Sequence, residues 1–314
     1  MRKLKTLLLI PALIVSASLS AAADSALLNL LPPDAQVIFG IHVEQSRYSP
    51  FGQFLLAKAE KEDGDLREFI AVTGFDPRRD ITELVGASRG AGKFGVVCVR
   101  GRFDMARIVS AAQAKEGATE QYQGATVIFG PGKKPHGVAF LDSTLAVAGD
   151  VDSVRAAIAR WRNGGALNPE TAARVMGTAG RYDAWIVTAV SPVELAGKIP
   201  DDTVSSTMQG DVIRAIEQMS GGVKFGADVT IAGESVLKTD KDAAALADVI
   251  RFMVSLAQFH GNAEAQARFG EYARRLDLAA EGNRVKLSLV IPEAEFEKLF
   301  QSLEKRPARR RPAD

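Results

Sequence analysis

The chain is poor in the residues that most often carry chemistry: its 314 residues include one cysteine and three histidines. A single cysteine, Cys98, cannot form an internal disulfide, so packing alone must stabilise the fold. Cys98 lies in an apolar, strand-like run, residues 94–100. A reactive cysteine needs an exposed, electropositive site, so this pattern predicts a buried and inert thiol.

The histidines do not form a metal-binding pattern. His42, His136 and His260 are far apart, and none has a cysteine or histidine two to four positions away, so no zinc motif is present. His42 is a candidate general base, although a partly exposed strand histidine is the simpler interpretation. We expect His136 in a loop and His260 at a helix C-terminus, where a protonated imidazole suits the helix dipole.

Nucleophile motifs are also missing, because the sequence has neither a Gly-x-Ser-x-Gly elbow nor a Ser-x-x-Lys set with its partners. Three carboxylate pairs could in principle do acid–base work or bind calcium: Asp76 with Asp80, Asp150 with Asp152, and Asp201 with Asp202. The first and last stand in turns near prolines, and the second fits helix capping. We therefore assign no catalytic, cofactor-binding or metal-binding residue and expect no cofactor.

One stretch imitates a phosphate-binding loop. Residues 86–95 read GASRGAGKFG, with a Gly-Lys pair at Gly92 and Lys93. Lys93 is followed by Phe94 instead of Ser or Thr, and by a strand-like run instead of a helix. The glycines instead indicate a hairpin turn, with Arg89 and Lys93 in solvent.

The only two tryptophans give no sign of a ligand cleft. Trp161 lies between two arginines at an expected helix end, which favours packing over the rim of the sheet. Trp185 lies in an apolar strand, which predicts a core position.

Long hydrophobic runs are confined to the start of the chain. Residues 1–23 combine three early positive charges, an apolar run and Ala21-Ala22-Ala23 before Asp24. This order is typical of a secretory signal peptide. Cleavage near Ala23 would leave a periplasmic or secreted protein; the alternative is an uncleaved N-terminal membrane anchor. No cysteine stands at the cleavage position, which excludes a lipoprotein.

The charge is unevenly distributed. The sequence has 39 basic and 38 acidic residues, but residues 1–23 hold three of the basic ones and residues 305–314 hold five, together with Asp314. The body between them therefore has 31 basic and 37 acidic residues, a net charge of −6. An acidic body argues against nucleic-acid binding. The basic tail could contact acidic lipid headgroups or an anionic polymer; the alternative is a solvated C-terminus.

Hydrophobic periodicity predicts an α+β fold with mostly antiparallel pairing. The order strand, helices, hairpin, helix, hairpin, helix occurs twice. We therefore expect two similar halves, 24–162 and 183–303, joined by a linker at 163–182 and followed by a disordered tail, 304–314. Each half should be a sheet built from strand-helix and hairpin-helix units, with helices packed on one face.

Three phrases carry a resemblance: LPPDAQVIF at 31–39, GFDPRRDI at 74–81 and DSTLAVAGD at 142–150. Together they resemble a set of exported bacterial proteins of unknown function with duplicated α+β units. The shared motifs are structural and bring no catalytic residues. We expect a non-enzymatic binding or accessory protein of the cell envelope, acting through a sheet face or helical groove on an envelope protein or polymer. The alternative is an envelope hydrolase whose site assembles from scattered residues.

Overall fold

The computed structural model describes residues 23–62, 64–90, 95–114, 117–130, 136–191, 207–257 and 263–304. Its strands are β1 (Val37–Ile41), β2 (Ile81–Ser88), β3 (Val96–Gly101), β4 (Thr119–Tyr122), β5 (Ala125–Phe129), β6 (His136–Asp142), β7 (Leu145–Asp150), β8 (Ala184–Thr188), β9 (Ile216–Lys224), β10 (Asp228–Leu237), β11 (Leu276–Glu281) and β12 (Arg284–Pro292). Its helices are α1 (Ser25–Leu28), α2 (Val43–Arg47), α3 (Pro50–Glu62), α4 (Gly64–Thr73), α5 (Pro77–Asp80), α6 (Met105–Ala114), α7 (Val151–Asn163), α8 (Pro169–Ala179), α10 (Thr207–Arg214), α11 (Asp240–Ala257), α12 (Ala263–Arg275) and α13 (Glu293–Glu304).

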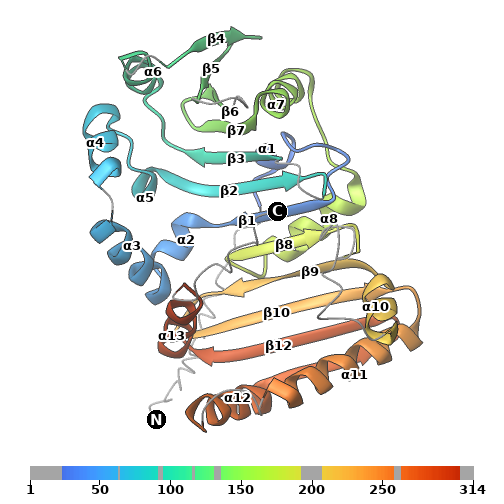
Figure 1. Cartoon of the computed structure of the whole chain (residues 1–314). Helices are drawn as coiled ribbons and strands as arrows, with labels where there is room; N and C mark the ends of the chain where they lie inside the picture. The colour runs from blue at the N-terminus through green and yellow to red at the C-terminus, as the bar shows by residue number, and fades with distance from the viewer. Residues whose placement is uncertain are drawn as a thin grey trace, which may run out of the picture.

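All of these strands belong to one antiparallel sheet (Figure 1), in the order β11-β12-β10-β9-β8-β1-β2-β3-β7-β6-β5-β4. Read outward from the centre, β1-β2-β3-β7-β6 and β8-β9-β10-β12-β11 follow the same plan, and the β4–β5 hairpin extends the first arm. The α+β class with antiparallel pairing is therefore confirmed. The two halves share one sheet, because β1 pairs with β8 at its centre.

The two halves meet at a close contact. Gly40 of β1 lies opposite Trp185 of β8. A Cβ atom at position 40 would come within 2.4 Å of the indole ring, so only glycine fits there. Trp185 is 3% exposed and belongs to the main core, as its apolar strand predicted.

Helices pack on both faces of the sheet. We call face I the one that carries Ile38, Cys98 and Val147, and face II the opposite one, which carries Phe39 and Phe140. On face I, α7 and α8 pack over the main core. On face II, α6 packs on the first half and α11 on the second.

The first half therefore differs from the expectation that each half has its helices on one face. The physical reason is that its strands carry buried apolar residues on both faces, as in β7, where Val147 points to face I and Ala146 to face II. In β12, Val285 and Leu287 point to face II, whereas Arg284 and Lys286 point to face I. The second half therefore buries face II and leaves face I polar.

Gly233 lies inside β10 opposite Gly221, where the strands approach so closely that a Cβ at position 221 would lie 2.8 Å from the Gly233 Cα. The segment expected as a linker, 163–182, contains helix α8. Its residues Val175 and Ala179 are part of the main core.

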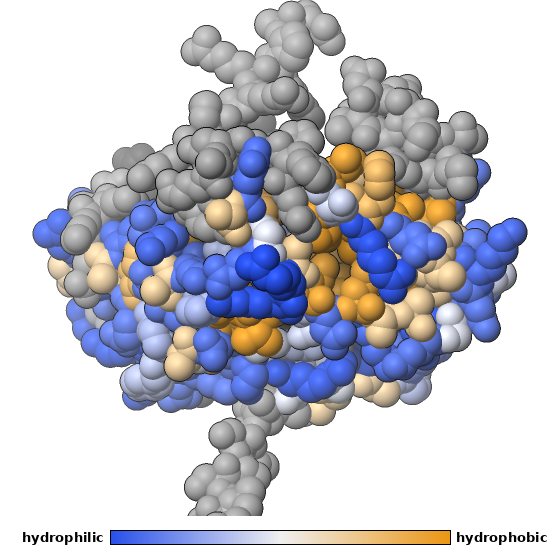
Figure 2. All heavy atoms as spheres, turned by 90° about the horizontal axis from the view of Figure 1, so that it is seen from below, coloured by the Kyte–Doolittle hydropathy of each residue, from blue (hydrophilic) through white to orange (hydrophobic). Residues whose placement is uncertain are grey.

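Figure 2 views the molecule from below, the side on which α11 and α12 lie in Figure 1. Hydrophobic surface is visible there among hydrophilic residues. The exposed apolar side chains of these two helices are Phe252, Met253, Leu256 and Phe269. Within the described ranges, no helix is long and apolar enough to cross a membrane.

Candidate functional site: an apolar hollow beside an arginine-rich turn

An apolar hollow of about 390 Å³ lies on face II of the first half, between α4, α6 and the sheet. Its lining residues are Phe69, Val72, Thr73, Phe75, Ile81, Val99, Phe103, Ile108, Ala111, Ala112, Ile128, Val138, Phe140 and Ala146. All of them except Thr73 are apolar. A volume of this size is in the range of pockets that hold small molecules.

Phenylalanines from four parts of the chain form a continuous wall in the hollow. Phe69 meets Phe75 edge-on at 6.2 Å between ring centroids. Phe75 lies 5.4 Å from Phe103, and Phe103 lies 5.2 Å from Phe140. Phe103 and Phe140 are buried, whereas Phe69 is exposed. The aromatic wall thus runs from the core to the surface, so the hollow has an apolar entrance.

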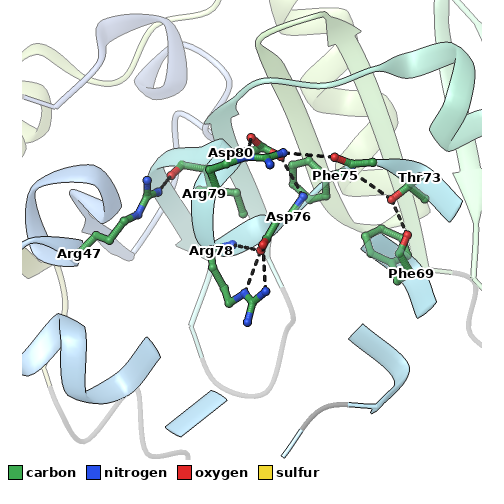
Figure 3. Close-up of polar contacts among 10 residues, drawn as sticks. Arg47, Phe69, Thr73, Phe75, Asp76, Arg78, Arg79 and Asp80 are labelled. Carbon is green, nitrogen blue, oxygen red and sulfur yellow. Dashed lines mark hydrogen bonds and ion pairs between the residues drawn. The ribbon is translucent and has the colours of Figure 1, made fainter. Parts of the chain in front are cut away.

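The one polar side chain of the lining is already satisfied. The Thr73 hydroxyl donates to the Phe69 carbonyl oxygen at 2.7 Å and accepts from the Phe75 backbone N–H at 3.2 Å (Figure 3). Both of its usual partners are therefore on its own chain segment. No titratable side chain belongs to the lining, so the hollow is suited to holding an apolar group rather than to transforming one.

A tight turn built from two carboxylate–arginine pairs borders the hollow (Figure 3). The Asp76 carboxylate accepts from Arg78 Nε and Nη2, both at 2.9 Å. The Asp80 carboxylate accepts from Arg79 Nε and Nη2, both at 2.7 Å. The backbone N–H of Asp76 also donates to Asp80 at 2.8 Å, which closes the turn around Pro77 and α5.

These hydrogen bonds lower the pKa of both carboxyl groups. The bond from Arg78 is the main cause for Asp76, and the bond from Arg79 is the main cause for Asp80. Both groups are therefore ionised and fully engaged near neutral pH. The structure thus places this candidate pair in a turn, as expected from the neighbouring proline, and gives it no free proton to exchange.

Beside the apolar hollow is a second, polar hollow of about 490 Å³. The two share Thr73, Phe75 and Phe103. The charged residues of the polar hollow are Arg79, Arg102, Arg107, Asp80 and Asp104. Asp80 is held by Arg79, and Asp104 accepts the backbone N–H of Arg107 at the start of α6. Within the described ranges, no ion pair engages the guanidinium groups of Arg102 and Arg107.

The other candidates from the sequence lie elsewhere. His42 was expected in a strand and partly exposed; it instead follows β1, at the start of α2, and is 5% exposed. Burial results because β1 ends at Ile41 and the chain turns inward, so that His42 Nε2 lies 3.2 Å from the Ala179 carbonyl oxygen. His136 begins β6 instead of lying in a loop, and its side chain is exposed. His260 lies outside the described residues.

The remaining carboxylates and the cysteine have structural roles. Asp150 caps α7 by accepting the Ser153 backbone N–H at 2.9 Å. Helix capping was the role expected for the pair Asp150 and Asp152. Asp201 and Asp202 lie outside the described residues. Cys98 is fully buried, as expected, and burial raises its pKa to about 12. Among the described residues, no group of histidine, cysteine, aspartate or glutamate could hold a metal ion.

In the stretch 86–95, which resembles a phosphate loop, the first glycine is explained by packing. Gly86 lies inside β2 under the Phe39 ring, and a Cβ there would come within 2.3 Å of the ring. Arg89 is exposed, as expected, and its Nε donates to Asp34 at 3.0 Å across the surface. Residues 91–94 lie outside the described ranges.

A polar hollow on face I of the second half is a weaker candidate. Its lining includes Arg174, Gln218, Glu234 and Arg284. These groups bind one another: Arg174 donates to Gln218 at 2.7 Å, and Arg284 donates to Glu234. Their mutual pairing leaves little charge for a ligand.

Sequence reasoning missed the apolar hollow. Its four phenylalanines come from α4, the two turns after α4 and β3, and β6, so no short motif contains them. The usable signal was local: Phe75 belongs to the stretch 74–81 that the sequence had already singled out, and Phe69 lies shortly before it.

Comparison with known proteins adds information on the fold alone. No protein-family model matches the chain, and a search of curated proteins finds no match. Among solved structures, the chain is similar to TP0453 in crystal form IV, with a TM-score of 0.52, and in crystal form III, with a TM-score of 0.51. Both comparisons give 12% identity and cover 88% of this chain and 97% of TP0453. This likeness extends over the whole α+β architecture and supports the expected fold class.

Proposed function

We propose that this chain is an exported, non-enzymatic binding protein of the bacterial envelope, and that its apolar hollow holds the hydrocarbon chain of an anionic amphiphile. The observation that carries the proposal is the lining of the hollow, which is apolar at every position except Thr73. Burial of hydrocarbon there is favourable by about 0.8 kcal/mol for each methylene group.

The adjoining polar hollow supports an anionic headgroup. A hydrocarbon chain that lies against Phe75 and Phe103 would place its polar end near Arg102 and Arg107. Both residues are exposed. Arg102 is close enough to Asp80 to help lower the pKa of that carboxyl group, but Asp80 already has its hydrogen bonds from Arg79. Asp104 is also present, so the attraction depends on the arginines outnumbering the free carboxylates. Carboxylate and phosphate oxygens are the groups that arginine binds best.

A binding experiment with the mature chain tests the apolar part of the proposal. Calorimetric titration with decanoate, dodecanoate and tetradecanoate should show affinity that rises by about fourfold for each methylene group. Dodecanol should bind more weakly than dodecanoate, and a lysophosphatidylglycerol with a twelve-carbon chain distinguishes a lipid from a free fatty acid. The absence of any dependence on chain length would refute the proposal.

A matched pair of variants locates the site. Val138 and Val290 are strand valines that are 38% and 42% exposed, but only Val138 lines the hollow. V138W should fill the hollow and weaken dodecanoate binding at least tenfold, because the indole occupies the space of the ligand. V290W should leave binding unchanged. Equal effects of the two substitutions would show that the ligand binds elsewhere.

A second pair tests the headgroup. The double substitution of Arg102 and Arg107 by glutamine should reduce the preference for dodecanoate over dodecanol several-fold while retaining dodecanol binding. Arg162, which stacks on Trp161 at a distance of 4.3 Å, supplies the control as R162Q. An unchanged preference in the double variant would remove the anionic headgroup from the proposal.

A further inference from the structure

The beginning of the described chain is part of the hydrophobic core. Ala23 is 3% exposed, and Leu27 and Leu31 are fully buried in the cluster that also contains Cys98 and Val147. Asp24 caps the short helix α1 by accepting the Ala26 backbone N–H at 2.8 Å. The chain is therefore held in one position from Asp24 onward.

The Asp24 side chain is anchored to the sheet. Its Oδ2 accepts from both Nε and Nη2 of Arg100, each at 2.7 Å. Arg100 also donates from Nη1 to the Thr144 hydroxyl at 2.9 Å. These contacts fix the place of the Asp24 backbone nitrogen.

That nitrogen points at a buried carboxylate. The Asp24 backbone N–H donates to Glu83 Oε1 at 3.2 Å. Glu83 is nearly buried in β2, and burial raises the pKa of its carboxyl group. A neutral amide is a weak partner for a carboxylate in such a place, because it supplies one hydrogen bond and no charge.

The other neighbour of Glu83 is the imidazole of His42, which carries a positive charge only when both of its ring nitrogens are protonated. His42 Nδ1 lies 3.7 Å from Glu83 Oε1. The Nε2 atom of the same ring faces the Ala179 carbonyl oxygen at 3.2 Å, and a carbonyl only accepts, so Nε2 carries the proton. Nδ1 therefore has a hydrogen to offer Glu83 only when the imidazole is protonated.

The charges of this cluster do not balance. The cluster contains the carboxyl groups of Asp24 and Glu83, the guanidinium of Arg100 and the imidazole of His42. Arg100 already pairs with the Asp24 carboxylate, so within this cluster an ionised Glu83 has no guanidinium or ammonium partner of its own. Buried charges are normally paired, so one further positive charge at the Asp24 nitrogen would complete the cluster.

We propose that the bond between Ala23 and Asp24 is a processing site, and that the α-ammonium group created at Asp24 forms an ion pair with Glu83 in the mature protein. Hydrolysis adds water across the Ala23–Asp24 amide: the C–N bond breaks, Ala23 keeps the new carboxylate, and the Asp24 nitrogen becomes an amine that takes up a proton. The precursor has only an amide at this position. Because Ala23 is buried in the folded chain, cleavage precedes folding.

The first test identifies the new N-terminus. The full chain is produced with residues 1–23 in a bacterial host that secretes proteins, and the exported product is analysed by intact mass and N-terminal sequencing. The proposal expects a chain that begins at Asp24. A chain that begins at any other residue, or that keeps residues 1–23, would overturn it.

The second test measures the ion pair. Two chains are compared, one beginning at Asp24 and one retaining Ala22 and Ala23, so that the Asp24 nitrogen is an amide. In the first chain, E83Q should lower the Tm by about 3 °C, the scale expected for one such interaction. In the second chain it should change the Tm by less than about 1 °C, because the near-isosteric amide still accepts the N–H. Equal shifts would overturn the ion pair.

A matched control and a pH profile complete the test. E120Q removes the partly buried carboxylate that pairs with Arg155 at 2.8 Å, and it should affect both chains equally. An α-amino group titrates at about 7.7–8.0 when unpaired, and pairing raises this value. The extra stability of the Asp24 chain should therefore be present just below about pH 7.7 and disappear as the pH rises through the raised value of the amine. It should also be lost in acid, when Glu83 takes up a proton. Glu83, His42, Arg100 and the Asp24 carboxylate face this group; the lack of such a decline would overturn the proposal even if E83Q fails to fold.

Discussion

At the scale of single residues, the junction between the halves depends on a missing side chain. The indole ring of Trp185 packs directly against the Gly40 backbone, in the space that a Cβ would occupy. The ring is buried, and its Nε1 has no hydrogen-bond partner in the described structure. The indole therefore stabilises the fold by packing alone, and it fits only because position 40 has no side chain.

This contact predicts that G40A destabilises the protein by about 2 kcal/mol, because a methyl group 2.4 Å from the ring forces the indole or the strand to shift. Chemical denaturation measures the loss. The control is G177A in α8, where a Cβ meets nothing within 4 Å. That substitution should stabilise the helix by roughly 0.5–1 kcal/mol. Similar losses in both variants would mean that the indole does not restrict position 40.

At the scale of elements, the turn that contains α5 connects α4 to β2 beside the apolar hollow. Its bonds from arginine to carboxylate lower the pKa of Asp76 and of Asp80. A carboxylate whose pKa is lower in the folded state stabilises the fold above its unfolded value, about 3.9, and loses this contribution as the pH falls through the folded value.

The turn should therefore weaken in acid. Between pH 7 and pH 3, the Tm of the wild-type chain should fall more than that of D80N, which lacks the titrating group but keeps the shape of the side chain. D80N should be the less stable of the two at pH 7. Parallel Tm profiles would show that Asp80 does not stabilise the turn through its charge.

At the scale of the whole molecule, the halves are joined by a continuous sheet and a shared core. The main core contains Ile38 and Val85 from the first half together with Trp185 and Val187 from β8. A second, separate cluster under α11 belongs to the second half alone. The division into the halves 24–162 and 183–303 remains a prediction from the sequence. In the structure, residues of both halves contribute to one core.

The shared core predicts a single unfolding transition. Both tryptophans, Trp161 and Trp185, belong to or pack on the main core, so their fluorescence reports on it. Far-UV circular dichroism reports on every helix and strand. The two signals should change at the same urea concentration. A dichroism transition without a matching fluorescence change would show that the second half unfolds on its own.

Features set by neighbouring residues could be read from the sequence. The β4–β5 hairpin turns at Gln123-Gly124, where both residues adopt the positive φ that a two-residue turn requires, 49° and 77°. Asp150 caps α7 through a residue three positions away. The apolar strand around Trp185 was correctly predicted as core. The α+β class followed from many such local patterns taken together.

Features set by distant residues were decided only by tertiary structure. The sequence could not show that Phe69, Phe75, Phe103 and Phe140 meet, nor that the Asp24 nitrogen reaches Glu83, 59 positions away. The close packing of Gly233 likewise depends on Gly221, which lies opposite it in another strand. Local propensity determines where a strand or helix forms, but pairing register determines which face each side chain occupies, and register is fixed by contacts between strands far apart in the chain.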